Sequence, residues 1–157
     1  MTVRPVVSFS AVASALATLA TLVGCATPSP YGNFVRGASA SFEQSIAADA
    51  VKQVATVYPP ANTRLDLQQP TPDAFGTSLV QALRARGYAV GEQGRPVQAT
   101  TASAPAAPGL PLRYVLDHAG SPDLYLVTLS IGSQSLARVY LMRGDAASPA
   151  GAWVRRE

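Results

Sequence analysis

The chain contains a single cysteine, Cys25, which follows a small residue at the end of an apolar N-terminal segment. Arg4 is the only charge before this segment, which runs from Val6 to Val23. A positive start, an apolar run and a small-residue cleavage site together make a secretory signal. The stretch Leu22-Val23-Gly24-Cys25 therefore predicts a lipobox, with cleavage before Cys25 and acylation of its thiol, for example by palmitate.

The alternative for this segment is an uncleaved membrane helix. Such a helix needs about 20 strongly apolar residues, whereas alanine is the commonest residue of this run, which also contains five hydroxyl side chains: Ser8, Ser10, Ser14, Thr18 and Thr21. An exported chain would normally use cysteines in disulfides, but no second cysteine is present to pair with Cys25. Both observations favour cleavage and lipidation.

His118 is the only histidine, and its neighbour Asp117 offers a carboxylate for an acid/base pair. General acid–base catalysis also needs a reacting group in defined geometry, and the surrounding sequence indicates only a turn. A solvated turn residue is therefore the favoured interpretation of His118. The sequence gives no sign that its candidate carboxylates converge: Asp66, Asp73, Asp117 and Asp123.

Motifs for other chemistry are missing from the sequence. It has no Gly-x-Ser-x-Gly elbow, no phosphate-binding glycine loop and no zinc-binding spacing. With one histidine and a lipidated cysteine, a structural transition-metal site is not expected. We predict no catalytic residues, no metal, no cofactor and no small-molecule substrate, so the chain is not expected to be an enzyme.

The net charge of +3 is spread along the chain and drops when Arg4 is removed with the signal. The remaining basic residues are scattered from Arg36 to Arg156 rather than gathered in a stripe. Nucleic-acid binding requires such a concentration of positive charge. We therefore expect no nucleic-acid partner.

Three parts are predicted along the chain: a signal peptide at 1–24, a lipidated flexible tether at 25–37 and a single domain at 38–157. Prolines, glycine and small polar residues after Cys25 are typical of an extended tether. The remaining length fits one domain with its own core. Within it, the Gly-, Ala-, Thr- and Pro-rich stretch 91–111 is predicted to be a mobile loop.

Two helices are expected in the domain. Apolar residues recur at helical spacing between 39 and 57, Ser41 and Gln44 have the spacing of a capping box, and Pro59-Pro60 ends the helix. In the second helix, Thr71 is the expected cap, with Pro72 at the first helical position. Its buried stripe and its terminating glycine are Phe75, Leu79, Val80, Leu83 and Gly87.

Strand patterns fill most of the rest of the domain. We predict strands at 63–67, 88–90, 112–117, 124–131, 136–142 and 153–155, with the 124–131 strand apolar at nearly every residue and therefore buried. The later strands follow one another as hairpins. This order predicts an α+β fold, with two helices packed on a mostly antiparallel sheet.

Two segments together resemble the TrbH family of small lipoproteins from conjugative plasmid transfer. They are the stretch 24–34, with the residues Gly-Cys-Ala-Thr followed by Ser-Pro-Tyr-Gly-Asn-Phe, and the helix-strand unit 72–90. The resemblance implies a component of the mating-pair-formation machinery, a type IV secretion apparatus. It also implies partners among the other secretion-channel proteins, and Cys25, which binds membrane lipid once acylated, is the only functional residue it carries over.

Ala26 bears on where the anchor is placed. Aspartate at this position retains enterobacterial lipoproteins in the inner membrane, so alanine favours the periplasmic face of the outer membrane, with the inner membrane as the alternative. Two other functions remain open. The helix end Leu83–Tyr88 suggests a peptidoglycan-binding envelope lipoprotein, and a tethered domain also suits a lipoprotein that activates an envelope enzyme.

Overall fold

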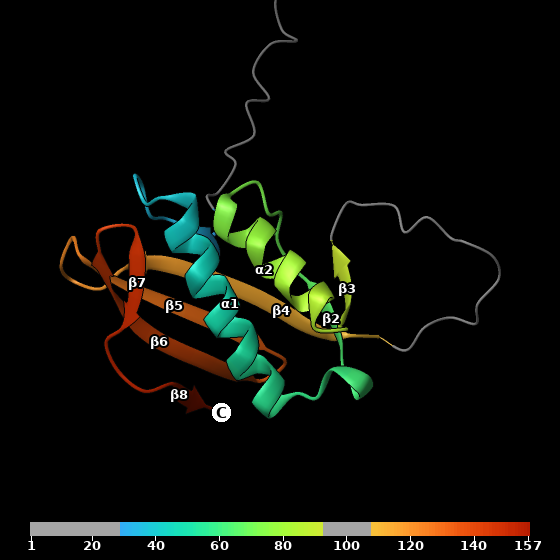
Figure 1. Cartoon of the computed structure of the whole chain (residues 1–157). Helices are drawn as coiled ribbons and strands as arrows, with labels where there is room; N and C mark the ends of the chain where they lie inside the picture. The colour runs from blue at the N-terminus through green and yellow to red at the C-terminus, as the bar shows by residue number, and fades with distance from the viewer. Residues whose placement is uncertain (1–28, 93–107) are drawn as a thin grey trace, which may run out of the picture.

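The computed structural model describes residues 29–92 and 108–157 (Figure 1). Two α-helices, α1 (Ala40–Val57) and α2 (Ala74–Ala85), lie next to each other on one side of a sheet. A short 3-10 helix, η1 (Pro60–Asn62), follows α1. The strands are β1 (Gly32–Asn33), β2 (Arg64–Leu67), β3 (Ala89–Glu92), β4 (Leu110–His118), β5 (Leu124–Ile131), β6 (Gln134–Arg143), β7 (Ala146–Pro149) and β8 (Val154–Arg156).

These strands form one sheet in the order β3-β2-β4-β5-β6-β7. β1 pairs with β4 beyond the end of β2, and β8 pairs with β6 beyond the end of β7. The pairs β1–β4, β2–β3 and β2–β4 are parallel, and the pairs from β4 to β8 are antiparallel. The predicted fold class, two helices on a mostly antiparallel sheet, is confirmed.

The core fills the space between the helices and the sheet. Alternate residues of β4 and β5 are buried beneath the helices, as the period of two in a half-buried strand requires. Two edge-to-face aromatic contacts join the layers: Phe42 of α1 lies 4.7 Å from Tyr125 of β5, and Phe75 of α2 lies 5.2 Å from Tyr114 of β4, measured between ring centroids. Such pairs add to the stability gained by burial alone.

Both helix caps differ from the prediction, although α1 begins close to the predicted residue 39. The cap of α1 is Ser39, whose hydroxyl accepts a hydrogen bond from the amide of Phe42, so the capping box at Ser41 and Gln44 is wrong. The cap of α2 is Asp73 rather than Thr71. Asp73 is the cap because its carboxylate accepts hydrogen bonds from both the amide of Gly76, at 2.8 Å, and the hydroxyl of Tyr114, at 2.6 Å.

The C-terminal part of the predicted tether belongs to the sheet. Gly32 and Asn33 form β1, and the Asn33 side chain donates a hydrogen bond of 2.9 Å to Glu43, a buried residue of α1. The extended tether predicted for 25–37 therefore stops short of residue 32. A two-residue strand has no alternating pattern of its own, so β1 has no local signature in the sequence.

Two further findings concern segments between the predicted strands. The segment after Arg143 forms β7, which was not among the predicted strands. Ala146–Pro149 has no large apolar residue, so it lacks the usual sequence pattern of a strand. The predicted loop 91–111 has its two ends in β3 and β4. Its central residues 93–107, like residues 1–28, lie outside the described part of the chain.

Candidate functional site

The residues of the predicted lipobox, Leu22, Val23, Gly24 and Cys25, lie outside the described residues. Lipidation of Cys25 therefore stays a prediction. The first described strand, β1, begins soon after Cys25, at Gly32. An anchor at Cys25 would thus connect directly to the β1 end of the sheet.

The candidate acid/base residues lie apart and make local contacts. Asp117 accepts a hydrogen bond of 2.7 Å from the backbone amide of His118, and the His118 ring lies 4.9 Å from the Tyr125 ring. Asp66 accepts from the Arg64 guanidinium at 3.0 Å and from a backbone amide in the approach to β4. These contacts match a turn and strand-end role. In residues 29–92 and 108–157, no three His, Cys, Asp or Glu side chains group closely enough to hold a metal ion.

On the helix side of the sheet, polar groups are paired between layers. Asp49 of α1 accepts hydrogen bonds from the Tyr140 hydroxyl, at 2.7 Å, and from the Arg138 guanidinium, at 2.9 Å. Asp73 and Tyr114 form the corresponding pair beneath α2. Burial, followed by the hydrogen bond to the aspartate and its negative charge, raises the pKa of both tyrosines well above the ordinary value of 10.

The opposite side of the sheet carries no described helix, and we call it the helix-free face. Strand register aligns its side chains in rows across β4, β5, β6 and β8. One row contains Val115, Thr128, Ala137 and Val154, and the next pairs Leu126 with Val139. Leu126 and Val139 are half-buried, and Val154 is 50% exposed. This face therefore presents apolar side chains to its surroundings.

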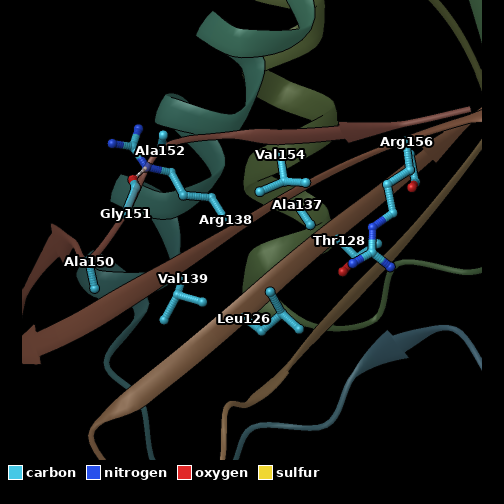
Figure 2. Close-up of a pocket in the computed structure, with 11 residues that line it drawn as sticks. Leu126, Thr128, Ala137, Arg138, Val139, Ala150, Gly151, Ala152, Val154 and Arg156 are labelled. Atoms are coloured by element: carbon cyan, nitrogen blue, oxygen red, sulfur yellow. Dashed lines mark hydrogen bonds between the residues drawn. The ribbon is translucent and has the colours of Figure 1, made fainter.

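A hollow of about 540 Å³ opens on this face (Figure 2). Leu126 and Val139 line its floor beside Ala137, and the segment Ala150–Ala152 runs along its side. The small side chains leave the space that larger ones would fill. Arg138 holds this segment in place by donating a hydrogen bond of 2.8 Å to the Gly151 carbonyl.

Arg156 stands at one end of the hollow near Thr128, and Ala150 lies at the other end (Figure 2). The exposed guanidinium of Arg156 forms no ion pair with any described residue, whereas the guanidinium of Arg138 forms an ion pair with Asp49. All residues that line the hollow are neutral apart from these two arginines. The hollow thus combines an apolar floor with one available positive charge.

Part of this site could be predicted from the sequence. The apolar residues on both faces of 124–131 led to a prediction of full burial, but Leu124 and Leu126 are only half-buried on the helix-free face. The hollow itself depends on β8 and on Ala150–Ala152 returning beside β6. That long-range pairing has no local sequence signature.

The described chain is thus a two-layer α+β module whose open sheet face carries a hollow. No helix in the described ranges is both long and apolar enough to cross a membrane. The family model of the conjugal transfer protein TrbH matches residues 28–157. The chain therefore belongs to the TrbH family of conjugal transfer proteins, which confirms the resemblance seen in its sequence. Searches among curated proteins and among solved structures gave no match.

Proposed function

We propose that this protein is a lipid-anchored envelope component of a conjugative type IV secretion apparatus and acts there as a non-catalytic assembly module. The observation that carries the proposal is the hollow on the helix-free face in a member of a conjugal transfer family. Exposed apolar surface on a small protein commonly marks a contact site. The module would contribute by joining other channel proteins through this surface.

The anchor in this proposal is acylated Cys25, at the periplasmic face of the outer membrane. The chain between Cys25 and β1 extends at most roughly 25 Å, because each residue spans about 3.3 to 3.6 Å. The domain would therefore stay close to the lipid surface. Confinement raises the local concentration of module and partner, so a weak contact between them is sufficient.

Plasmid transfer by three strains tests both parts of the proposal. One strain carries the wild-type gene, one carries Cys25→Ser with export to the periplasm retained, and one carries no copy. We expect transfer to be lost in the deletion strain and strongly reduced with Cys25→Ser, because stable anchoring needs more than one acyl chain and serine provides no thiol for the first.

Fatty-acid labelling of the same strains gives the matched control. Wild-type protein should incorporate label and Cys25→Ser should not. Normal transfer without any copy would refute the role in conjugation. Normal transfer by an unlabelled, exported Cys25→Ser protein would keep the module and remove the anchor from the proposal.

A further inference from the structure

We propose that the hollow on the helix-free face binds a segment of a partner protein that carries a large apolar side chain next to a carboxylate. The inference rests on the proposed function, since it names the chemistry of the partner that the module would join. Its evidence is the shape of the hollow, its charge and the composition of this chain.

The shape calls for an apolar anchor. Ala137, Gly151 and Ala152 leave a space of about 540 Å³ between larger neighbours, and Leu126 and Val139 provide an apolar floor. Binding energy at protein interfaces concentrates where a large side chain fills such a pocket and excludes water. A partner residue of aromatic or long aliphatic type fits this description.

The charge calls for a carboxylate beside that anchor. Arg156 at the end of the hollow has no ion-pair partner among the described residues, and the nearby Glu157 carboxylate is bonded to Arg155 and Gln134 instead. A guanidinium binds a carboxylate through two parallel hydrogen bonds. No acidic residue lines the hollow, and the acidic residue opposite its floor, Asp117, pairs with Leu126 rather than with the Thr128 end near Arg156. An acidic segment is therefore attracted at the Arg156 end.

A second copy of this chain fits less well. The most suitable anchor it exposes is Phe34, which is 45% exposed, but Arg36 follows two residues later. Docking Phe34 into the hollow would bring a second arginine toward Arg156. The chain also has a net charge of +3, so two copies repel each other where an acidic partner is attracted.

Site-specific photo-crosslinking in transfer-competent cells tests this inference with the full-length protein. Benzoylphenylalanine replaces Ala152, which lines the hollow and is exposed, or Ala146, an exposed alanine of β7 outside the hollow, as the control. We expect an adduct with another protein at position 152 and none at 146. Sequencing of the crosslinked peptide should show an apolar residue with Asp or Glu close to it.

Charge reversal then tests the role of Arg156. Arg156→Glu should lower the adduct yield at position 152 about tenfold, because like charges at an interface cost several kcal/mol. Arg143→Glu, a matched change at an exposed arginine outside the hollow, should leave the yield unchanged. Exchanging the partner's carboxylate for lysine should restore the adduct with Arg156→Glu.

Several results would overturn the inference. They are an adduct between two copies of this chain, an adduct with lipid, a crosslinked segment without a carboxylate, no adduct above the position 146 control, or equal loss with Arg143→Glu. Transfer frequency of the deletion strain is measured in parallel. If deletion abolishes transfer while the crosslinking fails, the docking chemistry is wrong and the proposed function stands.

Discussion

The two faces of the sheet use the same strands in different ways. Beneath the helices, the side chains of β5 are fully buried, as at Val127 and Leu129, whereas Leu126 and Thr128 on the same strand are only half-buried on the other face. The polar groups of the helix side have partners: the hydroxyl of buried Tyr140 and the guanidinium of Arg138 both donate hydrogen bonds to Asp49. On the helix-free face, the Arg156 guanidinium forms no ion pair within the described chain.

This contrast separates the residues that stabilise the fold from the residues that remain open to the surroundings. A buried hydroxyl or carboxylate without a partner would be costly, so the helix side must be internally complete. The helix-free face meets no such requirement, because its polar groups reach water. We therefore expect its half-buried apolar rows to add less to the stability of the fold than the residues beneath the helices do.

The largest expected effect on stability comes from truncating one leucine of β5 on each face of the sheet. Leu129→Ala should lower the free energy of unfolding by about 2 to 5 kcal/mol, since Leu129 is completely buried and its removal leaves a cavity. Leu126→Ala on the same strand should cost about 1 kcal/mol or less. Urea denaturation of both variants measures the difference. Equal losses would show that the helix-free face also belongs to the core.

Glycines on the two sides provide a second comparison. A Cβ on Gly76 of α2 would overlap the Tyr114 hydroxyl and approach the Thr71 Cβ to 2.9 Å, whereas a Cβ on Gly151 meets nothing within 4 Å. Gly76→Ala should therefore destabilise the protein by about 1 to 2 kcal/mol, with overpacking outweighing the better helix propensity of alanine. Gly151→Ala should change stability by less than about 0.5 kcal/mol. A stabilising Gly76→Ala in thermal unfolding would contradict this packing of α2 on β4.

The helix-covered layer could be predicted from the sequence to a large extent. The 124–131 strand has the predicted bounds, and the second helix ends before Gly87, which adopts a φ of 90°. These elements have strong local signals: an apolar run between turns, and a glycine that alone tolerates the left-handed conformation. Local periodicity is sufficient where one face of an element packs against one layer.

What the sequence did not reveal depends on distant partners. Asp73 rather than Thr71 caps α2 because Tyr114, far along the chain, fixes its carboxylate. β1 exists only through its pairing with β4, and the hollow exists only because Ala150–Ala152 returns beside β6. A candidate docking site built from small and aliphatic side chains, with one arginine that forms no ion pair among the described residues, has no motif, so its position becomes visible only once the strands are in register.

The smallest effect expected for a single side chain is an alkaline pH dependence of the tyrosine–aspartate pairs on the helix side. The pKa values of Tyr114 and Tyr140 are raised in the folded protein, chiefly by burial and then by their aspartate partners, and are near 10 in the unfolded chain. Both tyrosines are protonated in both states below pH 10, so the stability linked to them is fully present there. Above pH 10 the unfolded chain loses these protons first, and stability falls as the pH rises.

Urea midpoints at pH 8.5 and pH 11 measure this fall, which should be on the order of 1 kcal/mol for each tyrosine. The double variant Tyr114→Phe with Tyr140→Phe should lose less stability between the two pH values than the wild type, although it starts lower because Asp49 and Asp73 each lose a donor. Arg156→Glu on the helix-free face should leave the alkaline fall as it is. If the double variant and the wild type lose the same stability between the two pH values, the tyrosine–aspartate pairs do not distinguish the helix side. The difference between the helix side and the helix-free face would then rest on apolar burial alone.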